Sequence, residues 1–197
     1  MKSFLSALRI FVLLSLITGI LYPFLITGLA SMIFPRQAHG SLITNHEQVV
    51  GSSWLAQEFK SPRYFWPRPS SGSYATVPSG ASNLGPTSAA LKALVTERAV
   101  ALRQAHGLAA DALVPEELLQ ASGSGLDPEI SPAAARFQMQ RVCQARQFDA
   151  VQTQQVEALI AKLSEAPQFG FLGEARLNVL RLNLELDAVI SEPHAPR

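Results

Sequence analysis

The stretch IFVLLSLITGILYPFLITGLASMIF, from Ile10 to Phe34, is uncharged from end to end. At ~1.5 Å rise per residue, a helix of this length reaches ~37 Å, which is enough to cross a hydrocarbon layer ~30 Å thick. Gly19, Pro23 and Gly28 lie within the stretch, and such residues are tolerated in bilayer helices. We therefore predict a transmembrane helix from Ile10 to Phe34.

A cleaved secretory signal peptide is the alternative interpretation of this segment. Lys2 and Arg9 form a basic start, and the small residues Gly28 and Ala30 resemble a cleavage site. However, the apolar core of a signal peptide is typically ~7–15 residues long, and here the apolar run continues to Phe34. An uncleaved anchor fits this length better.

The charges beside the predicted span indicate its orientation. Lys2 and Arg9 precede the span, whereas only Arg36 follows it closely. Because positive charge is retained on the cytoplasmic side, we expect residues 1–9 in the cytoplasm, residues 10–34 in the membrane and residues 35–197 as an extracytoplasmic domain, and a bacterial periplasm is compatible with this arrangement.

The remaining composition suits one globular domain without special charge or redox chemistry. The chain has 197 residues and a formal net charge of +1, which gives no reason to expect a nucleic-acid partner. Its single cysteine, Cys143, cannot form an intrachain disulfide, although a periplasmic location would permit one.

Short strand signals follow the span, and a long loop follows them. Residues 41–43 and 48–51 flank a polar turn, which predicts a β-hairpin. Residues 61–86 are rich in Pro, Gly and Ser but also contain Tyr64, Phe65, Trp66 and Tyr74. A flexible linker would lack these rings, so we expect this loop to pack or to dock.

Helical patterns dominate the rest of the chain. We predict helices from Thr87 or Ser88 to Gly107, over residues 115–119, from Ser131 onward, over 156–163 with an end at Pro167, and from Asn178 to Val189. In the helix that ends at Gly107, Ala101 and Leu102 are expected on the buried face. In the helix that begins at Ser131, Cys143 is expected on the buried face. The last segment also alternates like a strand, but it lacks β-branched residues, which favours a helix. The predicted fold class is α+β, with one span and a mainly helical domain.

The sequence contains few catalytic or metal-binding signals. It has no phosphate-binding loop of the form G-x-x-x-x-G-K-[ST], no H-E-x-x-H and no C-x-x-C pair. The four histidines, at positions 39, 46, 106 and 194, are scattered without metal-ligand spacing, and we expect them to be exposed polar residues. We predict no catalytic residue, no metal site and no cofactor of its own.

One glycine-rich motif invites a hydrolase interpretation. Ser122-Gly123-Ser124-Gly125 could present a nucleophilic serine, but a G-x-S-x-G elbow needs a glycine two residues to each side of the serine, and neither serine has both. The alternative is a tight turn, with glycines at positive φ and Asp127 as a turn acceptor. We favour the turn.

Several segments, in order along the chain, resemble one known family. They are Gly51-Ser52 with Gln57, Tyr64-Phe65-Trp66-Pro67-Arg68-Pro69-Ser70, Ser82-Asn83-Leu84-Gly85-Pro86-Thr87, Ala121 to Pro128, Ile130-Ser131-Pro132, and Val179-Leu180 with Leu182-Asn183. The chain resembles KdpC, the C subunit of the bacterial Kdp potassium-transporting P-type ATPase, over nearly its whole length. Four positions depart from the family pattern: Pro67 and Ala81 replace glycines, Ser88 replaces asparagine and Glu129 replaces histidine.

This resemblance implies a non-catalytic subunit of a potassium import complex in the bacterial inner membrane, with residues 35–197 in the periplasm. Its partners would be an A subunit that conducts potassium, a B subunit that hydrolyses ATP and a small F subunit, together with membrane lipid. ATP and potassium would be ligands of the complex, and this subunit would act as an assembly factor and catalytic chaperone that raises the ATP affinity of the B subunit. The predicted topology allows only an indirect effect across the membrane.

The resemblance and the residue types together suggest where subunits could meet. Tyr64, Trp66 and Arg68 are residue types that often anchor interfaces, although core packing would equally explain Tyr64-Phe65-Trp66. The candidate contact motifs are residues 64–66 and 68, Ser82 to Pro86, Ser122 to Gly125, and Asp127. The rival function is a stand-alone, membrane-anchored periplasmic enzyme or ligand-binding module.

Overall fold

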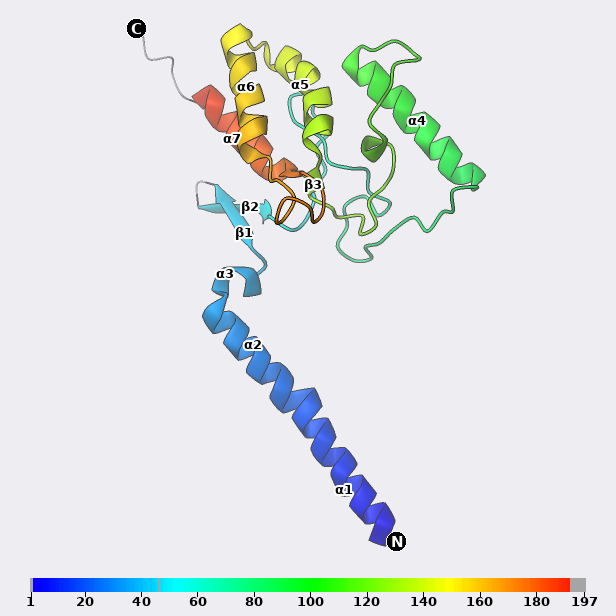
Figure 1. Cartoon of the computed structure of the whole chain (residues 1–197), viewed down its shortest axis with the longest axis vertical. Helices are drawn as coiled ribbons and strands as arrows, with labels where there is room; N and C mark the ends of the chain where they lie inside the picture. The colour runs from blue at the N-terminus through cyan, green and yellow to red at the C-terminus, as the bar shows by residue number, and fades with distance from the viewer. Residues whose placement is uncertain (1, 46, 192–197) are drawn as a thin grey trace. The chain divides into compact units, whose positions relative to one another are not determined.

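The computed structural model describes residues 2–45 and 47–191, and the chain divides after Ser52 into two compact units (Figure 1). His46 and His194 lie outside the described residues. Within these described residues, the first unit contains a long helix, a short helix and a β-hairpin, and the second contains four α-helices, two short strands and several long loops. The structure confirms the α+β class.

The long helix of the first unit runs without interruption from Lys2 to Ile33 and is long and apolar enough to cross a membrane. It comprises α1 (Lys2–Leu16), a π-helical turn (Ile17–Leu21) and α2 (Tyr22–Ile33), and none of its residues is buried. The helix thus begins eight residues before the uncharged run. The membrane boundaries at residues 10 and 34 stay a prediction.

The π-helical turn ends at Leu21, two residues before Pro23, the residue that disturbs the regular helix. Proline has no backbone N–H and its ring crowds the carbonyl one turn earlier, so a widened turn relieves that clash. The side chain of Thr18 donates a hydrogen bond of 2.7 Å to the carbonyl of Leu14 in the same region. The helix therefore passes Pro23 without breaking.

The predicted hairpin is present at the end of the first unit. After α3 (Pro35–Ala38), strand β1 (Leu42–Asn45) pairs antiparallel with β2 (Gln48–Ser52), with an irregularity between Ile43 and Thr44. The hydroxyl of Ser52 donates to the carbonyl of Gly40 at 2.7 Å and closes the base of the hairpin.

Capping residues define most helices of the second unit. The helices are α4 (Ala89–His106), α5 (Pro132–Arg146), α6 (Ala150–Leu163) and α7 (Val179–Ser191). The side chains of Ser88 and Ser131 accept hydrogen bonds from the first turns of α4 and α5, as predicted, and Asp149 forms a capping box on α6. Gly107 ends α4 at a φ of +63°.

The core lies where α5, α6 and α7 pack together, beside a two-stranded sheet formed by β3 (Glu129–Ile130) and β4 (Leu177–Asn178) (Figure 1). It is built from fully buried apolar side chains that include Ile130, Val142, Val156, Ile160, Leu177, Leu182 and Leu186. One of its members, Phe65, comes from the long loop and is also fully buried. The loop is therefore part of the core.

Some sequence-based details need correction. Ala101 is exposed, and Ala99 is buried in its place, because the buried face of α4 is narrow. Residues 116–118 form a 3₁₀ turn, and α6 ends at Leu163, four residues before Pro167, with Ser164 at its C-cap. The C-terminal segment is a helix, as favoured, and the side chain of Asn178 accepts a hydrogen bond from the N–H of Arg181 in its first turn.

Candidate functional site

The segment Pro62–Pro69, with the sequence PRYFWPRP, is the centre of the candidate site. Its three prolines carry no N–H and favour extended backbone, so the segment cannot join a sheet as a central strand. Its remaining backbone groups still need hydrogen-bond partners, because part of the segment is buried. Side chains from α5 and α7 supply most of them.

Two buried amide side chains pair with this segment as a neighbouring strand would. Asn183 of α7 accepts from the N–H of Phe65 at 2.8 Å and donates to the carbonyl of the same residue at 3.0 Å. Gln138 of α5 pairs in the same way with Trp66, at 2.8 and 3.0 Å. Both amides are at most 2% exposed, so these bonds are shielded from water.

Two arginines of α5 bind the preceding carbonyls. Arg141 donates to the carbonyls of Pro62 (2.6 Å) and Tyr64 (3.1 Å), and its guanidinium lies 3.8 Å from the centre of the Trp66 ring. Arg146 donates to the carbonyl of Arg63 at 2.7 Å and lies over the ring of Tyr64. Both arginines therefore combine hydrogen bonds with cation–π contacts.

An acidic side chain of α7 completes this network. Asp187 forms an ion pair of 2.7 Å with Arg146 and accepts a hydrogen bond of 3.1 Å from the hydroxyl of Tyr64. The guanidinium of Arg146 is almost fully buried, so this partner compensates a charge that would otherwise be costly.

His106 belongs to the same cluster, which corrects its assignment as an exposed residue. Its ring lies edge-on to Trp66 and 4.7 Å from Phe137, and its Nδ1 bonds to the carbonyl of Leu102. Its Nε2 accepts from Arg141 at 3.3 Å. Burial, with the nearby Arg141 charge, lowers the pKa of His106, and burial lowers the pKa of Arg141 to about 10. The neutral imidazole is therefore the favoured form.

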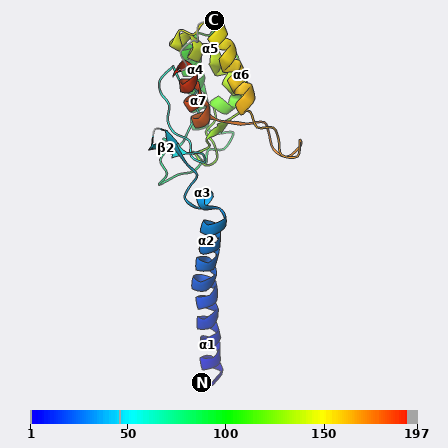
Figure 2. The ribbon, with the colours of Figure 1, turned by 90° about the vertical axis from the view of Figure 1, so that its left-hand side faces the viewer.

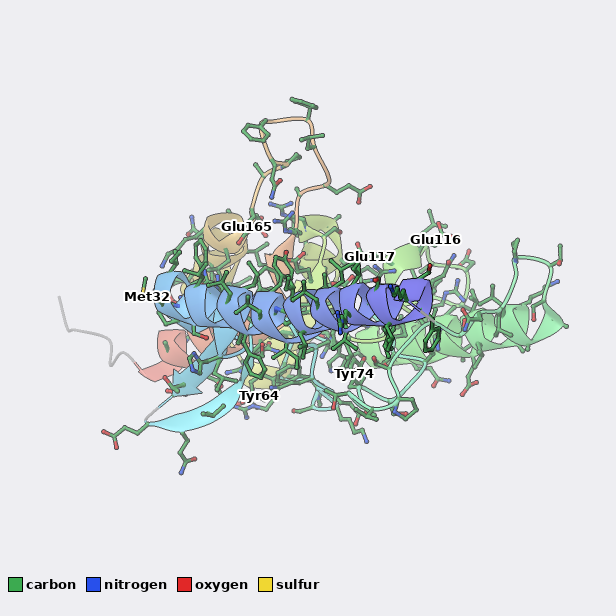
Figure 3. The ribbon with its side chains drawn as sticks, turned by 90° about the horizontal axis from the view of Figure 1, so that it is seen from below. Met32, Tyr64, Tyr74, Glu116, Glu117 and Glu165 are labelled. Atoms are coloured by element: carbon green, nitrogen blue, oxygen red, sulfur yellow. The ribbon has the colours of Figure 1, made fainter. Side chains whose placement is uncertain are left out.

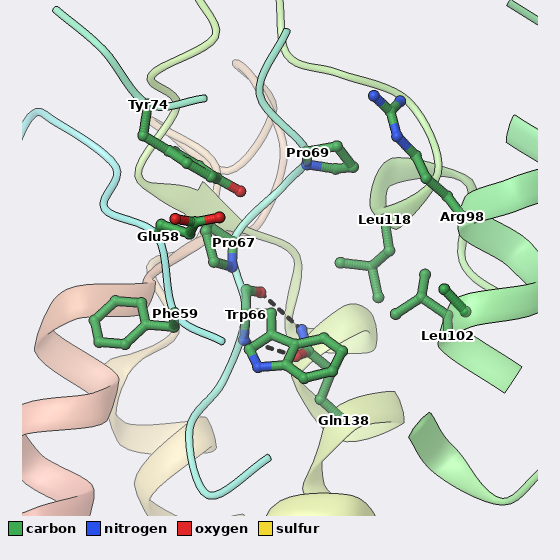
Figure 4. Close-up of a pocket in the computed structure, with 11 residues that line it drawn as sticks. Glu58, Phe59, Trp66, Pro67, Pro69, Tyr74, Arg98, Leu102, Leu118 and Gln138 are labelled. Atoms are coloured by element: carbon green, nitrogen blue, oxygen red, sulfur yellow. Dashed lines mark hydrogen bonds between the residues drawn. The ribbon is translucent and has the colours of Figure 1, made fainter. Parts of the chain in front are cut away.

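A cavity of about 290 Å³ lies beside Trp66, and its lining is mainly apolar (Figure 4). Its walls come from four parts of the domain: Glu58, Phe59, Trp66, Pro67, Pro69, Tyr74, Arg98, Ala101, Leu102, Leu118 and Gln138. Burial, helped by Glu58, raises the pKa of Tyr74 to about 12. Its neutral hydroxyl donates to the carbonyl of Arg68 at 2.9 Å. The cavity has room for a small ligand or a single side chain of a partner.

The serine and glycine motif is a tight turn packed against the same segment. The carbonyl of Pro69 accepts from the N–H of Ser122 at 3.2 Å, and Arg68 forms an ion pair of 3.0 Å with Asp127. The other carboxylate oxygen of Asp127 accepts from the N–H of Glu129, as expected of a turn acceptor. The hydroxyls of Ser122 and Ser124 likewise accept backbone N–H groups within the turn.

Gly125 has the positive φ predicted for this turn, at +69°, whereas Gly123 does not. A Cβ atom at Gly125 would lie 2.8 Å from the carbonyl oxygen of Gly80, so the backbones approach too closely for a side chain. The backbone of the turn therefore packs directly against the backbone at Gly80.

The third motif, Ser82 to Pro86, lies mostly on the surface. Leu84 is half-buried, its neighbours are exposed, and Asn83 has a φ of +53°. Ser82 lines a second cavity, of about 440 Å³, together with Ser70, Ser71 and Ala121 and the helix residues Leu91, Leu94 and Arg98. The structure thus brings all three sequence-predicted motifs into one region. Their role as subunit contacts stays a prediction.

The structure shows the surroundings of the four residues that depart from the family pattern. Pro67 is buried, Ala81 is exposed, and Ser88 caps α4. Glu129 pairs with Arg176 at 3.1 Å, and burial, partly offset by that arginine, raises the pKa of its carboxyl. None of the four disrupts the local structure.

Within residues 2–45 and 47–191, no group of three His, Cys, Asp or Glu side chains is placed to hold a metal ion. Cys143 is buried among core residues, and burial raises the pKa of its thiol.

An apolar N-terminal helix followed by one compact α+β domain defines a protein with a candidate membrane anchor and a single folded head. Residues 4–188 match the family model described as "KdpC: K+-transporting ATPase, c chain". The chain therefore belongs to the KdpC family.

Curated relatives agree with this family over nearly the whole chain. A KdpC subunit of a potassium-transporting ATPase from Janthinobacterium sp. is 50% identical over 195 residues, which cover 95% of this chain and 99% of the relative. Proteins of the same name from Citrifermentans bemidjiense (47% identical, 95% and 97% covered) and Mycobacterium tuberculosis (46%, 94% and 98%) are similarly related.

The side-chain pairing of Trp66 can be tested with one substitution. We predict that Gln138→Leu lowers the free energy of unfolding by roughly 2–4 kcal/mol, because it leaves backbone groups of Trp66 without partners. Gln144→Leu, at an exposed position of the same helix, should change it by less than about 0.5 kcal/mol. Chemical denaturation of the full chain in detergent measures both, and equal effects would contradict the pairing.

The glycine turn offers a second matched pair. Gly125→Val should destabilise the domain by about 2 kcal/mol or more, because valine is strained at positive φ and its Cβ would meet Gly80. Gly123→Val should be tolerated, since nothing lies within 4 Å of its Cβ position. Thermal melting and complex yield should fall together for Gly125→Val. A stable variant that abolishes transport would show a direct contact role instead.

Proposed function

We propose that this chain is a membrane-anchored accessory subunit of a potassium-importing ATPase complex, where it supports assembly and leaves ATP hydrolysis to another subunit. The observation that carries this proposal is the match to the KdpC family over residues 4–188, which includes the apolar helix as well as the domain. A match of this extent supports a subunit that carries both the apolar helix and the domain.

The charges beside the helix support a defined topology. Lys2 and Arg9 lie before the uncharged run and Arg36 lies after it, so the positive-inside bias places the N-terminus in the cytoplasm. The domain would then lie in the periplasm, outside the inner membrane.

The proposed partners are the three other Kdp subunits and membrane lipid. The A subunit would select and conduct potassium, the B subunit would hydrolyse ATP, and the small F subunit would complete the complex. A periplasmic domain cannot reach cytoplasmic ATP. Any increase in the ATP affinity of the B subunit would therefore be a coupling free energy transmitted through the membrane-spanning subunits.

The contacts within the domain suggest how the candidate motifs divide their roles. Phe65, Trp66 and Arg68 are engaged inside the domain, which favours a structural role. The exposed residues Ser82, Asn83, Gly85 and Pro86 are better placed for subunit contact. An exposed loop on a folded domain suits an assembly factor, because preorganised surfaces lose little entropy on binding.

A ligand-binding module is the second candidate function, and the apolar cavity beside Trp66 is the observation that favours it. Purified chain that binds a small molecule and associates with no other subunit would support this alternative.

The topology can be tested by cysteine accessibility. We replace Cys143 with serine and introduce a cysteine at the exposed residue Ser73, and we expect impermeant maleimide to label it from the periplasmic side of intact cells. A cysteine at Ser3 should be labelled only after the membrane is opened. Labelling in the reverse pattern, or a mature N-terminus at Ser31, would contradict the uncleaved anchor.

A deletion tests the role in transport. Loss of the gene should abolish growth at limiting potassium, and residues 36–197 without the anchor should rescue growth poorly, because the span supplies placement and high effective concentration. The purified full chain should show no ATPase activity and no saturable ATP binding at micromolar levels. Tight ATP binding in a preparation free of the B subunit would overturn the indirect coupling.

A further inference from the structure

The loop from Glu165 to Arg176, between α6 and β4, extends away from the helices of the domain (Figures 2 and 3). The N–H and carbonyl groups of Glu165 and Arg176 pair across its base at 2.7 and 3.0 Å. Closer to the tip, Gln168 and Leu172 exchange two further hydrogen bonds of 2.9 Å. The loop is therefore a narrow, hydrogen-bonded projection, which we call the 165–176 loop.

The tip of this loop is strongly apolar and exposed. Phe169 is 86% exposed, Phe171 is 75% exposed and Leu172 is 47% exposed, and no charge occurs from Ala166 to Gly173. Three large apolar side chains within four residues, at the end of a projection, leave a concentrated apolar surface in water. Such clusters mark interaction sites, whereas single exposed apolar residues are ordinary.

The base of the loop holds the tip in a fixed arrangement. Arg176 forms ion pairs with Glu129 of β3 at 3.1 Å and with Glu165 at 3.2 Å, which ties the loop to the small sheet. Phe169 adopts a φ of +55°, a conformation that is unfavourable for a bulky residue. A tip ordered before binding loses less entropy on association.

The charges around the tip indicate what kind of partner it meets. Glu165 and Glu174 flank the uncharged tip and are exposed. At the base of the loop, Arg176 pairs with Glu129 and Glu165, and Arg181 lines the same small pocket. Glu174 therefore leaves an acidic charge beside the tip. Segments that insert into membrane interfaces are usually rich in Lys, Arg and Trp, and acidic flanks are repelled by anionic lipid. The arrangement instead complements an apolar groove with a basic rim on a protein.

We propose that the 165–176 loop is a docking element whose tip, Phe169, Phe171 and Leu172, inserts into an apolar, basic-rimmed groove on another subunit of the transport complex. The inference rests on the proposed membership in that complex. A convex tip of this kind supplies the buried aromatic anchors that dominate the binding energy of many interfaces. The acidic flanks would fix its orientation at the rim.

The first test compares single substitutions in the full chain. Phe169→Ser should weaken recovery of the other subunits with a tagged chain by on the order of tenfold, as loss of an aromatic anchor does. Leu113→Ser is the matched control, because Leu113 is 93% exposed in a different loop. Both variants should melt like the wild type, since neither side chain is in the core. Equal recovery for both variants would overturn the proposal.

The second test identifies the neighbour directly and does not depend on the loss of a side chain. A photoreactive benzoyl-phenylalanine in place of Phe171 should cross-link in intact membranes to another Kdp subunit, identified by mass spectrometry, whereas the same group at Leu113 should not. Adducts only with lipid, only with a second copy of this chain, or none above the control would each overturn the proposal.

These outcomes are distinguishable from failure of the proposed function. If the wild-type chain recovers no other subunit, membership in the complex is wrong. If the wild type recovers the complex and Phe169→Ser recovers it equally well, only the docking role of the 165–176 loop is wrong.

Discussion

The pairing of the Pro62–Pro69 backbone with side chains is the interaction on which the domain depends. Every carbonyl from Pro62 to Trp66 accepts a hydrogen bond from a side chain of α5 or α7. Because Pro62, Pro67 and Pro69 lack an N–H, the segment cannot lie as a central strand, and in this domain side chains supply the donors that a neighbouring strand would supply. The sequence of one loop thereby dictates polar residues inside two helices, at positions where apolar residues would otherwise pack.

This constraint explains how the candidate motifs come to lie together. With residues 62–69 fixed on α5 and α7, Arg68 reaches Asp127 and the carbonyl of Pro69 reaches Ser122. The turn at Gly125 then contacts the backbone at Gly80, shortly before Ser82. Each motif therefore packs against the one before it, starting from residues 62–69 on α5 and α7. The cavity beside Trp66 lies between residues 62–69 and α4.

The sequence predicted the parts of the fold that have local signals. Ser88 and Gly107 mark the ends of α4, Ser131 with Pro132 marks the start of α5, and Gly125 has the expected positive φ. These features depend on neighbours within a few residues, so a single sequence contains the information needed to predict them.

The sequence did not predict the features that depend on distant partners. Gln138 contacts Trp66, which is 72 positions away in the sequence, and Asn183 contacts Phe65, which is 118 positions away. In a helical pattern, polar residues such as these indicate an exposed face. His106 was misassigned for the same reason, since its partners come from α5 and the long loop. The tip of the 165–176 loop was overlooked, although its uncharged run with two phenylalanines was a usable signal.

Amide hydrogen exchange of the full chain in detergent tests the central claim most directly. The N–H groups of Phe65 and Trp66 belong to a segment without helix or strand, yet each is bonded at 2.8 Å to a buried amide side chain. We predict that they exchange on the order of a thousandfold more slowly than the N–H of the exposed Val77 in the same loop. Exchange of all three at similar rates would contradict the account.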